Sequence, residues 1–234
     1  FCLDGSSRFI PVFFTFLVSF LLVGFLYDLD FDFYWVVISF FPAFLSLSTG
    51  FVNFYFPNTV LWFKVAFTIF YLFIYYLLLL SLNIFKVSAS REEGIPLLNA
   101  AKTALFLITT IIAFFSFTAL LKVFNFFLLQ LVFVVIFTFS YSYFLFTLNR
   151  GQEKDQRVLL GAGLVSFVSF QVFLAFAFLP VETFFRGLII AASFYVGISL
   201  ERDYFAHKIS TRLVLEYLFL LIFLGAAVFR FSLE

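Results

Sequence analysis

Residues 60–85 read VLWFKVAFTIFYLFIYYLLLLSLNIF and carry a single charge, Lys64. A helix that crosses the roughly 30 Å hydrocarbon layer of a bilayer needs about 20 apolar residues, at about 1.5 Å each. This run exceeds that length and is apolar on every side, whereas a membrane-barrel strand alternates apolar and polar residues over about ten positions. The stretch therefore predicts a transmembrane α-helix, whose backbone satisfies its own hydrogen bonds in lipid.

Seven further runs share this character. They span residues 9–27, 33–56, 103–124, 126–148, 158–179, 181–200 and 213–229. The run 33–56 contains Pro42 and the segment SLSTG at 46–50, so a kink or break is expected there, and the run 213–229 is short. We predict an all-α, polytopic transmembrane helical bundle of about eight spans, with seven and nine as the alternatives.

Composition supports the same class. The chain has 234 residues, of which 65% are hydrophobic and 12% charged, whereas about a quarter of a soluble domain is charged. The net charge of +1 gives no basic surface, so no nucleic-acid partner is expected. Cys2 is the single cysteine, which excludes an internal disulfide and a cysteine-based metal cluster. The chain begins at Phe1 and has no Met, so we interpret it as a fragment whose start lies upstream.

No long linker interrupts the chain, so residues 1–234 are predicted to form one integral membrane domain. With eight spans, the three longer charged loops, 86–102, 149–157 and 201–212, lie on one face of the membrane. These loops hold nine basic residues: Lys86, Arg91, Lys102, Arg150, Lys154, Arg157, Arg202, Lys208 and Arg212. The other face holds five, near the ends of spans: Arg8, Lys64, Lys122, Arg186 and Arg230. Because basic residues concentrate in cytoplasmic loops, the three loops are predicted to be cytoplasmic.

Residues 181–187 read VETFFRG. The segment resembles the first motif of the CAAX-protease and bacteriocin-processing family of intramembrane proteases, Glu-Glu-x-x-Phe-Arg-Gly. In that family the first Glu activates a water and the second pairs with the Arg. Here Val181 stands at the first Glu, so the resemblance implies at most a catalytically degenerate relative. The structural alternative, which we favour, places Glu182 in the first helical turn, paired with Arg186 four residues on.

Other ionisable groups give weaker signals. The carboxylates of Asp28, Asp30 and Asp32 are ligands suited to Mg²⁺ or Ca²⁺, but this single cluster is better explained as a solvated turn. His207, the one histidine, could relay protons, and a solvated interfacial role is expected instead. Glu216 follows Arg212 by four residues, which predicts an interfacial ion pair. No catalytic residue, metal or cofactor is expected.

Uncharged groups within the spans predict helix contacts. Gln130 and Gln171 are deep amides, whose ordinary role is interhelical hydrogen bonding, and a transporter would place them beside a polar cavity. Small residues line one side of the run 158–179 and recur in the run 213–229, namely Gly161, Ala162, Gly163, Ser166 and Ser169, then Gly225, Ala226 and Ala227. They predict close helix packing, within the chain, between copies in a homo-oligomer, or with another membrane protein.

Three segments carry a family resemblance. Residues 82–89 (LNIFKVSA), 94–103 (GIPLLNAAKT) and 215–218 (LEYL) look like a family of uncharacterised multi-pass membrane proteins from candidate-phylum bacteria. The resemblance implies an integral protein of the bacterial cytoplasmic membrane, in contact with membrane lipids, and implies no particular chemistry. The leading hypothesis is a non-enzymatic structural or assembly component. The alternatives are a small transporter or permease subunit and the degenerate protease relative.

Overall fold

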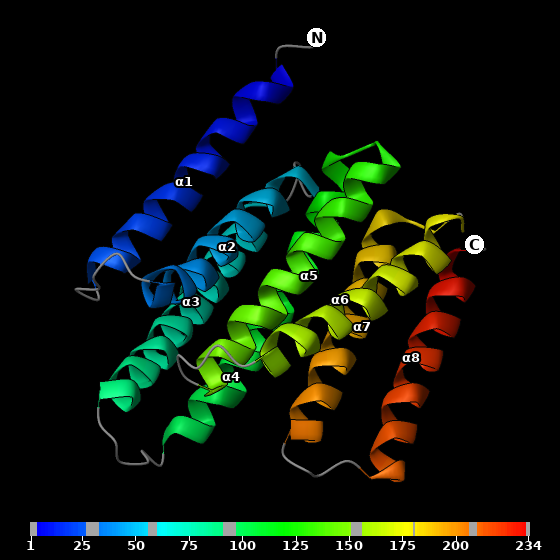
Figure 1. Cartoon of the computed structure of the whole chain (residues 1–234). Helices are drawn as coiled ribbons and strands as arrows, with labels where there is room; N and C mark the ends of the chain where they lie inside the picture. Colours follow the sequence, from blue (N-terminus) through cyan, green and yellow to red (C-terminus); the bar gives the residue numbers. More distant parts are fainter. Residues whose placement is uncertain are drawn as a thin grey trace. The chain divides into compact units, whose positions relative to one another are not determined.

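The computed structural model describes residues 4–26, 33–55, 60–90, 97–150, 156–179, 181–205 and 210–232. Every regular element in these ranges is an α-helix (Figure 1). The eight helices are α1 (Asp4–Leu26), α2 (Phe33–Tyr55), α3 (Leu61–Ser90), α4 (Leu97–Val123), α5 (Phe127–Arg150), α6 (Gln156–Ala177), α7 (Thr183–Phe205) and α8 (Thr211–Ser232). Each of the eight predicted runs thus contains one helix, and the all-α prediction is confirmed.

Six of these helices, α3 to α8, are long and apolar enough to cross a membrane. Within the described residues, α1 and α2 contain shorter apolar segments, Val12–Phe25 and Ile38–Gly50. The described residues are therefore all-helical, and their apolar helices are typical of a membrane-embedded protein. The count of eight spans stays a prediction.

Helix α2 corrects one expectation, because it continues without a break through Pro42 and the polar segment that follows. Ser46 Oγ donates a hydrogen bond to the Pro42 carbonyl at 3.0 Å, and Thr49 Oγ1 donates to the Leu45 carbonyl at 2.7 Å. Such bonds to the preceding turn satisfy the hydroxyls inside the helix. The polar segment therefore has no need to unwind. Of the two predicted alternatives, the break is wrong and the kink stays a prediction.

The chain divides into two compact units, and the first comprises α1, α2, α3, α4 up to Ala119 and the end of α5 from Thr147. In this unit α1 packs along α2, and α2 packs against α3. The Ser48 and Ser116 hydroxyls, 2.8 Å apart, join α2 to α4. The interior consists of fully buried apolar side chains, among them Ile38, Phe41, Leu78, Leu82, Leu105 and Ile112.

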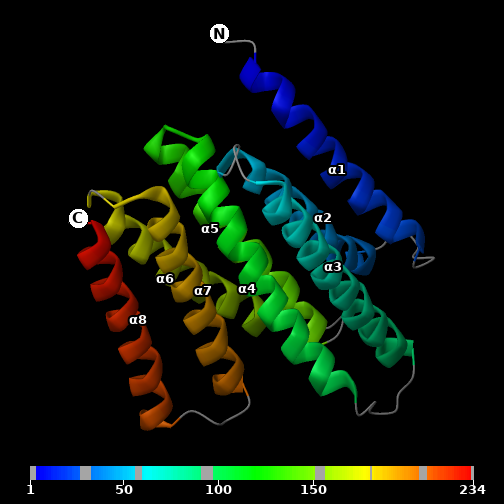
Figure 2. The same ribbon diagram turned by 180° about the vertical axis from the view of Figure 1, so that it is seen from behind.

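The second unit comprises the end of α4 from Leu120, α5 up to Phe146, and α6, α7 and α8. Helices α6 and α7 lie side by side in both views (Figures 1 and 2), and α7 also contacts α8. A Cβ atom on Gly197 of α7 would lie only 3.2 Å from Cγ1 of Val165 in α6. On α5, Thr138 Oγ1 donates to Ser166 Oγ of α6 at 3.1 Å, and Ser166 donates to the Val135 carbonyl at 3.0 Å. Close contact between helices is thus achieved through small and hydroxyl side chains.

The small-residue prediction is confirmed for most of its members in α6. Gly161, Ala162, Ser166 and Ser169 are buried. Gly163 differs, because a Cβ atom added there would meet nothing within 4 Å. Gly163 therefore takes no part in close packing within the described residues. The expectation of a single domain over residues 1–234 stays a prediction.

Candidate functional site

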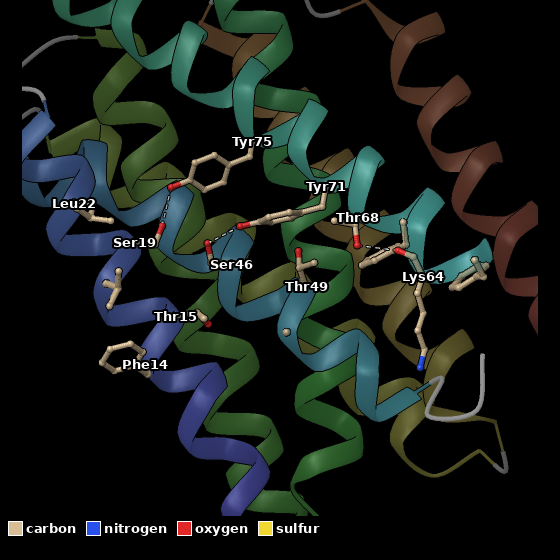
Figure 3. Close-up of a pocket in the computed structure, with 14 residues that line it drawn as sticks. Phe14, Thr15, Ser19, Leu22, Ser46, Thr49, Lys64, Thr68, Tyr71 and Tyr75 are labelled. Atoms are coloured by element: carbon tan, nitrogen blue, oxygen red, sulfur yellow. Dashed lines mark hydrogen bonds between the residues drawn. The ribbon is translucent and has the colours of Figure 1, made fainter. Parts of the chain in front are cut away.

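A cavity of about 620 Å³ lies in the first unit between α1, α2 and α3 (Figure 3). Its wall contains seven hydroxyl-bearing side chains: Thr15, Ser19, Ser46, Thr49, Thr68, Tyr71 and Tyr75. Apolar side chains complete it, and three of them, Phe14, Leu22 and Phe63, are between 48% and 64% exposed. The cavity thus has a mostly apolar wall that carries several hydroxyl groups, with exposed apolar side chains on α1 and α3.

Two tyrosines of α3 reach across to the other two helices. The Tyr71 hydroxyl is 3.0 Å from Ser46 Oγ of α2, and the Tyr75 hydroxyl is 3.0 Å from Ser19 Oγ of α1 (Figure 3). Ser19 and Ser46 are buried. These two bonds link all three helices of the cavity at positions that are far apart in the sequence.

The protons of these hydroxyls can be assigned. Ser46 donates its only proton to the Pro42 carbonyl, so Tyr71 must be the donor to Ser46, and the Tyr71 oxygen keeps acceptor capacity. The Ser19–Tyr75 pair has two protons, and the bond between the two residues uses one of them. One O–H of this pair is therefore left to donate to a molecule in the cavity.

Lys64 is the single charged residue among the described residues that line the cavity. It lies in the first turn of α3, and its side chain is exposed. In the parts of the chain that the structure describes, no acidic group lies within ion-pair distance of its ammonium. The ring of Phe67 stacks on Phe63 and meets Phe115 of α4 edge-on, so the wall beside Lys64 is aromatic and held in place.

Sequence reasoning treated Lys64 only as a charge near the end of a span. The missed signal is the spacing of Lys64, Thr68, Tyr71 and Tyr75, which follow one another by four, three and four residues. Residues at this spacing share one face of a helix. The sequence therefore carries a stripe of one cation and three hydroxyls along one face of a largely apolar span.

The sequence-predicted pair of Glu182 and Arg186 does not form. Glu182 is exposed, and Arg186 Nη2 donates instead to the carbonyls of Leu179 and Val181, each at 3.3 Å. These carbonyls belong to the connection between α6 and α7, which lies beside a buried apolar cluster of Val181, Ile189 and Val228. The guanidinium of Arg186 therefore binds the backbone carbonyls of this connection and not the carboxylate of Glu182. The predicted ion pair is wrong.

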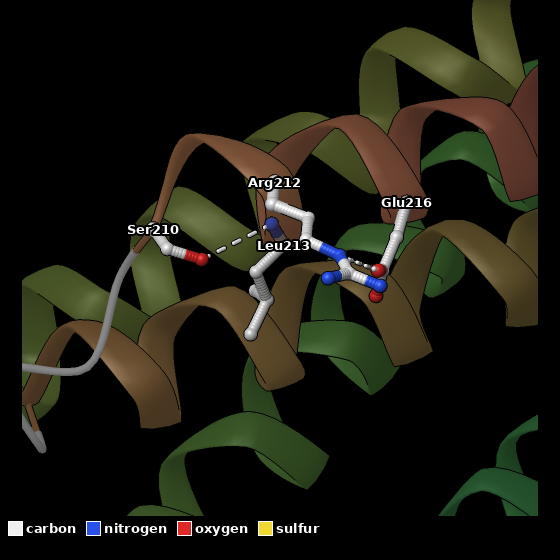
Figure 4. A network of polar contacts seen from close by, with 4 residues as sticks. All are labelled: Ser210, Arg212, Leu213 and Glu216. Carbon is white, nitrogen blue, oxygen red and sulfur yellow. Dashed lines mark hydrogen bonds and ion pairs between the residues drawn. The ribbon is translucent and has the colours of Figure 1, made fainter.

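The predicted pair of Arg212 and Glu216 is confirmed, with Arg212 Nε 3.0 Å from Glu216 Oε1 (Figure 4). Ser210 Oγ accepts a hydrogen bond from the backbone N–H of Leu213 at 3.3 Å, so Ser210 caps the start of α8. Both members of the ion pair are largely exposed. The pair belongs to the first turns of α8 and does not line the cavity between α1, α2 and α3.

The two deep amides have different surroundings. Gln130 of α5 is buried, and its Nε2 donates to the carbonyls of Leu121 and Phe124 at 3.1 and 2.5 Å. The carbonyls at the end of α4 have no backbone N–H partner within the helix, and Gln130 supplies donors to two of them. The predicted interhelical hydrogen bonding of Gln130 is confirmed. Gln171 is exposed on α6. Neither amide lines the cavity described above.

The remaining candidates, Asp28, Asp30, Asp32 and His207, lie outside the described residues. Within the described ranges, no group of three His, Cys, Asp or Glu residues is placed to hold a metal ion. In comparisons with known proteins, no family model, curated protein or solved structure matches the chain. Both family resemblances therefore stay predictions.

Proposed function

We propose that this chain is a non-enzymatic integral membrane protein that binds a membrane amphiphile in the cavity between α1, α2 and α3. The observation that supports the proposal is a cavity of about 620 Å³ between apolar helices, whose wall carries seven hydroxyl groups and one lysine among apolar side chains. Pockets for small molecules commonly measure about 300–1,000 Å³. A purely structural component has no need of such a space.

The chemistry of the cavity suits an amphiphile. The seven hydroxyls of the lining are already hydrogen-bonded within the protein. A polar group of a bound molecule would add to these bonds, because the hydroxyl oxygens keep acceptor capacity and the Ser19–Tyr75 pair keeps one O–H to donate. The exposed side chains of Phe14 and Leu22 on α1 and Phe63 on α3 are apolar, so a hydrocarbon chain can leave the cavity sideways into the bilayer. A molecule with one polar end and one apolar end satisfies both surfaces.

The proposal includes the membrane topology that the charge pattern predicts. Eight spans would place residues 86–102, 149–157 and 201–212 in the cytoplasm of a bacterial cell. In a Cys2→Ser background, we expect a cysteine at Gln152 to resist a membrane-impermeant maleimide in intact cells, and a cysteine at Asn58 to react. The reverse labelling pattern would overturn the orientation.

A cavity-filling substitution tests the binding function. Thr68 lines the cavity, whereas its neighbour Ile69 lies outside it and is 63% exposed. Thr68→Phe places a ring in the cavity, so the amount of lipid that co-purifies with the protein, counted by native mass spectrometry, is expected to fall severalfold. Ile69→Phe adds the same ring outside the cavity and should retain the lipid. Equal lipid retention in both variants would exclude the cavity as a binding site.

The second candidate function is a small transporter or permease subunit. The same cavity favours it, because a carrier must first bind its substrate within the membrane. Uptake or flipping of the bound amphiphile in proteoliposomes separates the two functions. Movement that is abolished by Thr68→Phe indicates a carrier, and binding without movement indicates a binding component.

A further inference from the structure

We propose that the amphiphile is an anionic phospholipid whose phosphate lies at Lys64. This inference rests on the proposed function, because it assigns a chemical class to the occupant of the same cavity. The charge of the lining supports the headgroup, the course of α3 gives the path of the lipid chain, and the depth of Lys64 assigns the leaflet.

The charge of the lining favours an anion. Lys64 is the one charged residue among the described residues that line the cavity, and no described carboxylate pairs with it. A lysine at the edge of the hydrocarbon layer is stabilised by anionic lipid headgroups. A zwitterionic headgroup would bring a second cation towards this ammonium, with no acidic partner in the described lining. A phosphate with no accompanying cation is therefore the better match.

The course of α3 from Lys64 gives the path of the lipid. Lys64 is in the first turn, and Tyr71 and Tyr75 follow seven and eleven residues later, or about 10 and 16 Å deeper at about 1.5 Å per residue. The ester groups of a phospholipid lie beside its phosphate, so a phosphate at Lys64 leaves an acyl chain to run past these tyrosines. The apolar side chains of Phe63, Phe67 and Phe14 provide part of the wall along this path.

The depth of Lys64 assigns a leaflet. Helix α3 begins at Leu61, so Lys64 lies at the membrane face where α3 begins. In the proposed topology this is the face opposite the charged loops. The bound phospholipid would therefore come from the outer leaflet of the membrane, with its phosphate near the surface and its chain between α1 and α3.

The test compares two lysines that the topology places on the same face. Purified protein in neutral detergent is incubated with phosphatidylglycerol and phosphatidylcholine of identical chains, and the bound lipids are counted by native mass spectrometry. The wild-type protein is expected to bind phosphatidylglycerol about fivefold more than phosphatidylcholine. This ratio corresponds to the roughly 1 kcal/mol that one lysine gains near anionic lipid headgroups. Lys64→Gln should remove this preference. Lys122→Gln, an exposed lysine at the end of α4 and outside the cavity, should keep it.

The outcomes separate the two proposals. If Thr68→Phe lowers binding of both lipids while Lys64→Gln leaves the preference intact, the binding function stands and the headgroup assignment is wrong. If Lys122→Gln removes the preference as fully as Lys64→Gln, the effect is general surface charge and the assignment is again wrong. Displacement of the lipid by inorganic phosphate alone would identify a site for a free anion and would overturn the lipid. If Thr68→Phe changes nothing, the proposed function itself fails.

Discussion

Replacement of Gly197 with leucine is expected to separate α6 from α7 and to lower the free energy of unfolding by about 3 kcal/mol, as for other overpacked interiors. Even a Cβ atom at this position would lie 3.2 Å from Cγ1 of Val165. Val165 is 2% exposed and β-branched, so its side chain has few other rotamers to adopt. The remaining atoms of a leucine side chain can be accommodated only if the two helices move apart.

Gly163→Leu is the matched control, because it introduces the same side chain on the partner helix at a position where a Cβ atom meets nothing within 4 Å. It should change the free energy of unfolding by less than about 0.5 kcal/mol. Equilibrium unfolding in mixed detergent and dodecyl sulfate, followed by circular dichroism, measures both variants. Equal losses of stability would show that the contact between Gly197 and Val165 does not hold α6 and α7 together.

Arg186→Leu is expected to lower the free energy of unfolding by about 2 kcal/mol, because it removes the charged donor to the carbonyls of Leu179 and Val181. The substitution also makes α7 more apolar, and leucine enters a bilayer more readily than arginine does. The variant should therefore insert into the membrane as well as the wild type. A loss of stability can then be attributed to the missing hydrogen bonds of the guanidinium. The same detergent unfolding experiment, with the amount of inserted protein as a second readout, measures the effect.

Glu182→Gln is the control for this second prediction. The structure shows no ion pair between Glu182 and Arg186, so neutralising the carboxylate should leave stability nearly unchanged. In a relative of the CAAX-type proteases, where the corresponding Glu pairs with the Arg, both substitutions would be damaging. Equal losses from Glu182→Gln and Arg186→Leu would therefore favour the protease resemblance over the structural role described here.

Ion pairs between residues four positions apart were predictable from the sequence in one of two cases. Arg212 and Glu216 are four residues apart, so a single helical turn brings them together, and their ion pair forms as predicted. Glu182 and Arg186 have the same spacing and do not pair. The difference lies in the surroundings, because the preceding connection offers carbonyl acceptors to Arg186. Spacing determines which partners are within reach, and neighbouring groups determine which of them is chosen.

The cavity was not predicted because its walls come from distant parts of the sequence. Ser19 and Tyr75 are 56 residues apart, and Ser46 and Tyr71 are 25 apart. In a soluble helix the polar residues mark the outward face. These spans are apolar on nearly every side, so the pattern does not distinguish a face that meets lipid from a face that meets another helix. The two deep amides, Gln130 and Gln171, are the clearest polar signals within the spans, and neither lines the cavity.

The sequence by itself determined the helical class and the position of each of the eight helices. The reason is local: a long apolar run in lipid must satisfy its backbone within itself, and only a helix does so without a partner. The tertiary structure alone decided that Lys64 and the hydroxyls of three helices surround one cavity. That arrangement depends on which helix faces meet, and it is set by close packing at small residues and by hydrogen bonds between helices, which hydropathy does not encode.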